Sequence, residues 1–250
     1  MSELNEERAA ARDATNWAKS VSRLDVSAMP DEAVNRVSGK RLVGPIQGFG
    51  KMWQKTYQVQ LPGDVVVPTA LIDTWRQNFS SFWPEGHRFY APLTGITPGE
   101  VALINAPMPG GLKLSTGVMV LYSDEESFTL MTPEGHVFAG WITFSATERD
   151  DATVAQVQLL MRAADPICEV GLVLGGHSQE NGFWEGTLTR LAAHWGVEAD
   201  VDTAVVCVDK KRQWKRWTNL AQSSVIWSTY YTLGAPFRAV RSWARRGRSG

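Results

Sequence analysis

The chain has 250 residues, of which 44% are hydrophobic and 20% are charged, close to the average of globular proteins. These values exclude wholesale disorder and leave room for one large domain with a substantial core. The net charge of −1 conceals an asymmetry, because residues 209–250 hold ten Lys or Arg and one Asp, whereas residues 1–208 hold fifteen basic and twenty-five acidic residues. An acidic body joined to a basic tail predicts an anionic partner for the tail.

Two features of the sequence bear on its location. No stretch approaches the ~18 to 20 apolar residues of a membrane span, and the opening MSELNEERAAARDATNW lacks the apolar segment of a secretory signal. Cys168 and Cys207 have neither CxxC spacing nor an evident partner, which favours free thiols over a disulfide. We therefore expect a cytoplasmic protein, in solution or peripheral on the cytoplasmic membrane.

In chain order, residues 3–22 are rich in alanine and charge and predict a helix. The stretch SAMPDEAVNRVSGKRLVGPIQGFGK is dense in turn formers and predicts an irregular lead-in. WQKTYQVQL then alternates, with Trp53, Tyr57, Val59 and Leu61 on one side, as a half-buried strand does. TALIDTWRQNFSSFWP has helical spacing and ends at Pro84.

Five further strands are expected over residues 100–106, 115–123, 126–132, 136–148 and 153–163. The joints between the later four are short, which predicts an antiparallel meander. A long helix follows, because eight side chains fall within an arc of about 100°. They are Val170, Leu174, His177, Asn181, Trp184, Leu188, Leu191 and Trp195. Gly175-Gly176 is expected to kink this helix or to delay its start, and residues 202–209 predict a last short strand.

This order of elements resembles the helix-grip fold of the START and Bet v 1-like (SRPBCC) superfamily. GEVALINAP, the acidic hairpin SDEE and the pair Gly135-His136 are similar to a bacterial and plant branch of that superfamily without an assigned activity. The resemblance covers about residues 50–196. It implies an α+β domain over residues 41–208, with a curved antiparallel sheet of six to seven strands wrapped around the long C-terminal helix. Residues 1–40 form a helical extension and lead-in, and residues 209–250 form a basic, Trp- and Arg-rich amphipathic tail.

The resemblance also implies a chamber between sheet and helix, since members of the superfamily carry lipids, sterols, polyketides or other apolar molecules. We therefore expect binding or carriage of an apolar or amphipathic small molecule. Expected lining residues are Tyr57, Phe128, Leu130, Phe138, Ile142, Phe144, Val157, Leu159, Met161 and Trp184. One alternative is a cyclase or dehydratase of the same fold acting on a polyketide-like substrate. Another is a structural or interaction module whose chamber is filled by its own side chains.

Three polar residues are the expected ligand contacts in that chamber. His136 follows the PEG turn at the start of a strand, and His177 and Asn181 lie one turn apart on the apolar stripe. His136 and His177 are also weak candidates for a catalytic acid or base. The alternative for His136 is a histidine that caps a hairpin, and for the other two it is structural hydrogen bonding. No metal-ligand spacing or cofactor motif is present.

The tail interleaves aromatic and basic residues. Trp214, Trp217 and Trp227 come first, and after Pro236 an arginine stripe lies opposite Trp243 on a helical projection; the stripe is Arg238, Arg241, Arg245 and Arg248. This pattern is typical of a helix lying in a lipid interface, so an anionic membrane surface is the preferred partner. The alternatives are packing on its own domain or in a homo-oligomer, a nucleic acid, and a partner protein.

Overall fold

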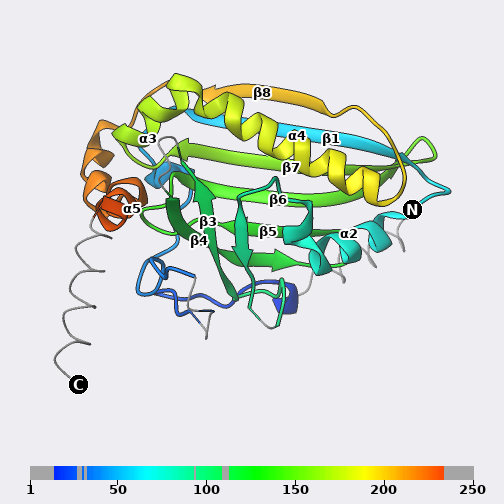
Figure 1. Cartoon of the computed structure of the whole chain (residues 1–250), viewed down its shortest axis with the longest axis horizontal. Coiled ribbons are helices and arrows are strands. Elements are labelled where there is room, and N and C mark those ends of the chain that lie inside the picture. Colours follow the sequence, from blue (N-terminus) through cyan, green and yellow to red (C-terminus); the bar gives the residue numbers. More distant parts are fainter. Residues whose placement is uncertain (1–13, 27–29, 31–32, 93, 109–112, 234–250) are drawn as a thin grey trace, which may run out of the picture.

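Figure 1 shows the computed structural model of the chain, which describes residues 14–26, 30, 33–92, 94–108 and 113–233. Eight strands form one antiparallel, curved sheet in the order β2-β3-β4-β5-β6-β7-β1-β8. The strands are β1 (Met52–Pro62), β2 (Arg88–Tyr90), β3 (Val101–Pro107), β4 (Lys113–Ser123), β5 (Ser127–Met131), β6 (Phe138–Arg149), β7 (Ala152–Ala163) and β8 (Asp202–Asp209).

The helical elements lie at both ends of the sheet and across one of its faces (Figure 1). They are η1 (Ala14–Asn16), η2 (Pro45–Gln47), α2 (Pro68–Gln77), η3 (Phe79–Phe82), α3 (Pro166–Gly171), η5 (Leu172–Gly176), α4 (His177–His194), η6 (Trp214–Gln222) and α5 (Ser224–Leu233). Among the described residues, no helix is long and apolar enough to cross a membrane.

The predicted meander is confirmed, because β3 to β7 are neighbours both in sequence and in the sheet. The sheet has eight strands instead of six to seven because β2 pairs with β3 at one edge and β8 pairs with β1 at the other. Gly140 of β6 lies close to the backbone of β7: a Cβ there would be 2.1 Å from the carbonyl oxygen of Leu160. Only glycine fits this position.

The long C-terminal helix consists of α3, η5 and α4. Leu174 and Gly175 leave the helical region, and Gly175 has a φ of +119°, which favours glycine. The kink expected at Gly175-Gly176 is therefore confirmed. It also corrects the predicted stripe, because the change of direction turns Val170 and Leu174 away from the sheet and leaves them 57% and 80% exposed.

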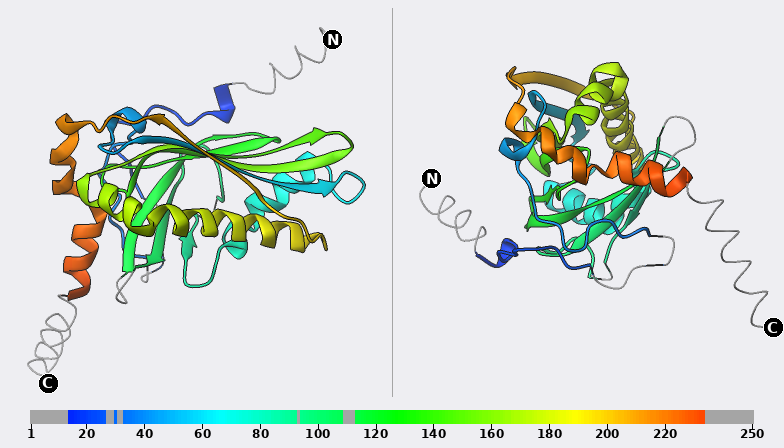
Figure 2. Two further views of the ribbon diagram at one scale, coloured as in Figure 1. Left: turned by 90° about the horizontal axis from the view of Figure 1, so that it is seen from above. Right: turned by 90° about the vertical axis from the view of Figure 1, so that its left-hand side faces the viewer.

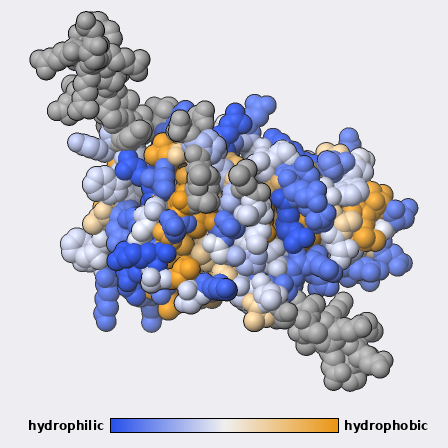
Figure 3. All heavy atoms as spheres, turned by 90° about the horizontal axis from the view of Figure 1, so that it is seen from below, coloured by the Kyte–Doolittle hydropathy of each residue, from blue (hydrophilic) through white to orange (hydrophobic). Residues whose placement is uncertain are grey.

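The predicted helix over residues 3–22 is wrong for its described part, and residues 1–13 lie outside the described residues. Only η1 is helical; beyond it Trp17 pairs with Tyr122, and the backbone N of Ala18 donates to Leu121 O at 2.8 Å. Leu24 and Val37 of this lead-in pack on the outer face of β3 and β4. Tertiary contacts thus outweigh the helix propensity of the alanine-rich sequence. On this underside, hydrophilic residues surround smaller hydrophobic patches (Figure 3).

The main core lies between the inner face of the sheet, α4 and the α2–η3 segment. α2 begins at Pro68, whose fixed φ suits the first helical turn. Its spacing turns Leu71, Ile72 and Trp75 toward the sheet, where all three are fully buried. α4 contributes Leu188 and Leu191, which are also fully buried.

Candidate functional site

The residues predicted to line a chamber lie together on the sheet face that α4 covers. Eight belong to the main hydrophobic cluster, and Phe138 and Trp184 pack against it. The eight are Tyr57, Phe128, Leu130, Ile142, Phe144, Val157, Leu159 and Met161. Each keeps 8% or less of its surface accessible, and four keep none: Tyr57, Phe128, Phe144 and Val157. These four side chains therefore touch no space as large as a water molecule.

Aromatic side chains of α2 and η3 fill the space beside them. The rings of Phe128 and Phe144 stack with centroids 4.6 Å apart. Trp75 and Phe79 meet Phe144 edge-on at 5.3 and 5.0 Å, and Trp184 of α4 meets it at 5.5 Å. The helical spacing of residues 69–84 predicts a helix but does not indicate where its aromatic side chains go. This part of the interior is filled by the protein's own rings.

A polar cluster lies in the same interior, where β1 passes under the start of α4. The Nζ of Lys55 donates to Glu180 Oε2 at 2.7 Å, to Asn181 Oδ1 at 2.9 Å and to the carbonyl oxygen of His177 at 3.5 Å. The Tyr57 hydroxyl donates to the same Asn181 oxygen at 2.8 Å. We call these five residues the Lys55 cluster; it brings together the predicted contacts Tyr57, His177 and Asn181.

Burial sets the protonation states in the Lys55 cluster. It raises the pKa of Glu180, although the Lys55 ammonium counteracts part of this rise. Burial and the nearby Glu180 carboxylate raise the pKa of the Tyr57 hydroxyl, which stays protonated and able to donate. Burial, reinforced by Lys55, lowers the pKa of His177, so its ring is neutral near pH 7.

Two polar atoms of the Lys55 cluster have no hydrogen-bond partner among the described residues: Glu180 Oε1 and His177 Nδ1. The His177 ring lies edge-on to Trp53, with centroids 4.8 Å apart. Since an unpaired buried polar atom costs about 1–3 kcal/mol, both atoms are suited to hydrogen-bonding a guest molecule or a water. Glu180 Oε1 accepts, whereas His177 Nδ1 accepts or donates according to the tautomer of the ring.

Lys55 and Glu180 were missed at the sequence level, although a signal for each exists. The alternation of β1 places Lys55 on the inner face with Tyr57 and Val59, where a lysine is unusual. Glu180 lies three residues after His177, on the same face of α4. A lysine and a glutamate on two inward faces predict a buried ion pair, but only the tertiary structure shows that they meet.

His136 lies elsewhere, in the turn between β5 and β6, because β6 begins at Phe138 instead of at residue 136. Its Nδ1 accepts a hydrogen bond from the backbone N of Phe138 at 3.0 Å. This is the hairpin-capping role named as the alternative above. Burial lowers the pKa of His136 to about 4, so the ring is neutral at physiological pH.

The first part of the tail packs against the body. Arg212 pairs with Glu169 of α3 at 2.8 Å, and the Trp214 ring meets Phe49 edge-on at 5.2 Å. The backbone N of Ser224 donates to the carbonyl oxygen of Gly135 at 2.7 Å. This corresponds to the alternative of packing on its own domain, yet the tryptophans at 214, 217 and 227 keep large exposed surfaces. Arg238, Arg241, Trp243, Arg245 and Arg248 lie outside the described residues.

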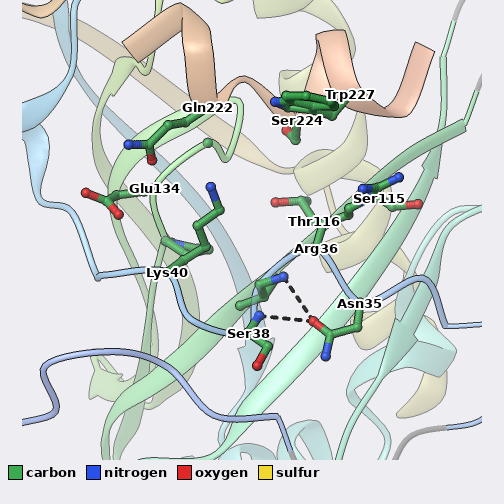
Figure 4. A pocket seen from close by; sticks show the side chains of 13 residues that line it. Asn35, Arg36, Ser38, Lys40, Ser115, Thr116, Glu134, Gln222, Ser224 and Trp227 are labelled. Atoms are coloured by element: carbon green, nitrogen blue, oxygen red, sulfur yellow. Dashed lines mark hydrogen bonds between the residues drawn. The ribbon is translucent and has the colours of Figure 1, made fainter. Parts of the chain in front are cut away.

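Two cavities lie outside the core, between segments that the sequence pattern does not connect. One of about 320 Å³ lies between the lead-in, the β5–β6 turn and α5 (Figure 4). The other, of about 480 Å³, lies between the lead-in, the same turn and η6, with Arg41, Asn219 and Arg216 in its lining. Neither involves a predicted ligand-binding residue.

No family model and no curated protein matches the chain. Several solved structures are similar to part of it. Protein Ms6760 from Mycobacterium smegmatis is 15% identical over 56% of this chain and 89% of that one, with a TM-score of 0.40. Major latex-like protein 151 from Panax ginseng is 14% identical over 59% of this chain and 100% of its own length, with a TM-score of 0.35. The di-domain ARO/CYC StfQ from the steffimycin biosynthetic pathway is 13% identical over 57% of this chain and 50% of its own length, with a TM-score of 0.40.

The strand order and the position of α4 across the inner face establish the architecture. The chain has the helix-grip fold. The expectation of an antiparallel sheet wrapped around a long C-terminal helix is thereby confirmed, and so is the resemblance at the level of the fold. Within this helix-grip body, the Lys55 cluster is the polar site that lies between helix and sheet.

The ion pair of the Lys55 cluster makes a prediction about stability. Lys55→Met leaves the Glu180 carboxylate buried without its cation and should lower the free energy of unfolding by about 3–5 kcal/mol. The double variant Lys55→Met with Glu180→Leu should recover most of this loss, because it removes both charges together. Urea denaturation of the two variants measures the difference. A loss below about 1 kcal/mol in the single variant would show that the pair is not buried.

His136 makes a prediction about pH. Its folded pKa of about 4 lies below the ordinary value of 6.5, so the unfolded chain binds the extra proton first as pH falls. Stability should therefore decrease between pH 6.5 and 4, with about 3 kcal/mol of this decrease due to His136. His136→Asn keeps an acceptor for Phe138 N without titrating, so its unfolding free energy should fall less over this range. Identical pH profiles for the two proteins would contradict the assignment.

Proposed function

We propose that the protein acts at the surface of a negatively charged membrane. It attaches by the end of the molecule that carries α3, η5, η6 and α5, here called the docking end (Figures 1 and 2). The observation that supports this is a set of large apolar side chains left exposed there. They are Ile167, Val170, Val173, Leu174, Trp214, Trp217, Trp227 and Tyr230.

The exposure of these side chains has a structural cause. Around the kink at Leu174–Gly175, Val170, Val173 and Leu174 face outward. η6 is held against the body through Arg212 and Asn219, whose side chains bond Glu169 Oε1 and the carbonyl oxygens of Gln47 and Ala164. The backbone is therefore anchored while the indole rings stay outside. Tryptophan at the level of lipid headgroups is favourable because its ring is apolar and its N–H is polar.

Charge supports the same orientation. Besides Arg212, which pairs with Glu169, four exposed basic residues precede or interrupt the aromatic ones: Lys210, Lys211, Lys215 and Arg216. Each adds about 1 kcal/mol of attraction near an anionic bilayer. Residues 234–250 add five arginines and one tryptophan by sequence. Apolar side chains to insert and cations to bind phosphate groups are the two signals that stable peripheral attachment requires.

Vesicle co-sedimentation tests this proposal. The full chain should pellet with anionic phosphatidylglycerol vesicles and much less with neutral phosphatidylcholine vesicles. Leu174→Glu and Trp217→Glu should each weaken binding roughly tenfold, because each replaces an inserted apolar group by a repelled charge. Val67→Glu is the matched control: Val67 is also exposed but lies at the opposite end of the sheet, before α2. Equal pelleting of all four proteins on anionic vesicles would refute attachment by the docking end.

A second candidate function is the binding of a small amphipathic molecule between helix and sheet. The unpartnered Glu180 Oε1 and His177 Nδ1 favour it, since each leaves a hydrogen bond to be made in an apolar setting. The filled aromatic interior implies that such a guest displaces protein side chains instead of occupying an existing void. Cyclisation or dehydration of the guest would use His177 as the base, because its neutral ring lies in the Lys55 cluster.

Native mass spectrometry of purified protein separates these possibilities. A carrier should show an added mass that disappears on solvent extraction, and Glu180→Gln should reduce its occupancy. His177→Phe keeps the edge contact with Trp53 but removes one polar contact to the guest. It should therefore lower occupancy by about tenfold and, in an enzyme, also abolish turnover of the guest that still binds. A consistently empty protein, with no guest that raises its melting temperature, would favour a filled core and leave membrane attachment as the function.

A further inference from the structure

The strand β8 forms one edge of the sheet and leaves one side of its backbone open. It comes last in the strand order and pairs with β1 alone (Figure 1). On its other side, no backbone hydrogen bond joins β8 to any described residue. Residues 202–206 and 208 of this strand are exposed. An edge strand of this kind carries a row of N–H and C=O groups that can pair with another strand.

The open edge of β8 lacks the features that usually prevent such pairing. Proteins protect a sheet edge by keeping the edge strand short or by placing Lys, Pro or a bulge in it. The opposite edge is protected in this way, because β2 has only three residues and begins with Arg88. β8 has eight residues, and its central run Ala204–Val208 contains neither a charge nor a proline. A shift of register opposite Met52 and Trp53 places a bulge only at the end of this run.

Both faces of β8 are open as well. Val205 and Val206 point to opposite faces of the sheet, yet they are 42% and 56% exposed. The helix α4 reaches the beginning of the strand, where the Thr203 hydroxyl donates to Glu185 Oε1 at 2.8 Å. A strand that pairs with β8 would therefore need apolar side chains on both of its faces. The run Ala204–Val208 of a second copy meets that requirement.

The charges on either side of the apolar run are complementary between two copies. Asp200 and Asp202 precede the run and Lys210 follows it, and all three are exposed. Within the described part of the chain, none of them forms an ion pair. When two copies pair antiparallel, the beginning of each strand lies beside the end of the other, so aspartate meets lysine at both ends. Parallel pairing would place like charges opposite each other, which is destabilising.

We propose that β8 pairs antiparallel with β8 of a second copy, which joins two sheets into one. A two-fold axis perpendicular to such a sheet places one residue opposite its own copy. Pairing the run Ala204–Val208 with itself puts this axis at Val206. Val205 then lies opposite Cys207, and Asp202 lies opposite Lys210 on both sides of the axis. The interface goes beyond the proposed membrane attachment and contains none of the exposed apolar residues of the docking end.

Sedimentation velocity of the full chain, without lipid and with a reducing agent, tests the proposal. An interface of a few paired residues is small, so we expect a dissociation constant of about 1–100 μM. The native chain should therefore change from the mass of a monomer to that of a dimer between about 1 and 500 μM.

The first variant places a charge at the two-fold axis. Val206→Lys should weaken the dimer at least about tenfold, because two lysines then lie opposite each other. Val67→Lys is the matched control, since Val67 is 54% exposed and lies before α2, outside β8. It adds the same charge to the chain and should leave the dissociation constant unchanged.

The second set of variants exchanges the charges at the two ends of the interface. Asp202→Lys and Lys210→Asp should each weaken the dimer about threefold to tenfold. The chain that carries both changes should recover the native dissociation constant, because each lysine again meets an aspartate of the other copy. Within one chain the two positions lie about 26 Å apart along an extended strand, well beyond the Debye length at physiological salt. Recovery therefore reports a contact between copies.

The proposal is supported by a dimer that Val206→Lys weakens, that Val67→Lys leaves intact and that the double exchange restores. It is overturned when the native chain stays monomeric at the highest concentration, which would leave β8 to a strand of a different protein. A dimer that Val206→Lys and Val67→Lys affect equally, or a double exchange as weak as the single changes, also overturns it. Because no vesicles are present, the outcome does not depend on whether the docking end binds a membrane.

Discussion

The aromatic packing between the α2–η3 segment and the sheet is the interaction on which the rest of the structure depends. Trp75 and Phe79 lie against Phe128 and Phe144, and Trp184 brings α4 into the same group of rings. Each such pair adds about 0.5–1.5 kcal/mol beyond its area burial. Because these rings occupy space that a helix-grip chamber would enclose, this part of the interior is closed.

The Lys55 cluster is the polar exception in this interior. Replacing a buried ion pair by well-packed apolar residues is often neutral or stabilising, so its presence is weak evidence for stability. It does select one position of α4 on β1, since sliding the helix by one residue would separate Glu180 and Asn181 from Lys55 Nζ. We interpret the cluster as the feature that determines how the helix lies on the sheet, with Glu180 Oε1 and His177 Nδ1 as polar atoms without a hydrogen-bond partner among the described residues.

The segments outside the helix-grip core meet one another on one side of the sheet. The lead-in and the tail both contact the β5–β6 turn: Arg41 pairs with Glu134, and Ser224 bonds to Gly135. Both cavities lie where these segments meet. The same turn contains His136, whose ring caps the hairpin through Phe138 N. A turn that resembles a superfamily motif in sequence therefore serves in this chain to hold two extensions together.

Several features follow from the sequence alone, because they depend on neighbours only a few residues away. The alternation of β1, the short turns of the meander, and the kink at Gly175 are local consequences of side-chain period and backbone freedom. The inward face of Phe128, Phe144 and Val157 was predictable for the same reason. The local preference for a helix did not predict the structure after Asn16, where Trp17 pairs with Tyr122.

Only the tertiary structure decided what lies between helix and sheet, because residues from about 40 to more than 120 positions apart meet there. Helical spacing shows that Trp75 and Phe79 share a face, but not that their rings fill the interior. Alternation places Lys55 inward, but not opposite Glu180, 125 residues away. The cavity of about 320 Å³ combines residues 36, 134 and 224, which no local pattern relates. Distant contacts of this kind depend on how all elements pack at once, and a single sequence does not display that information locally.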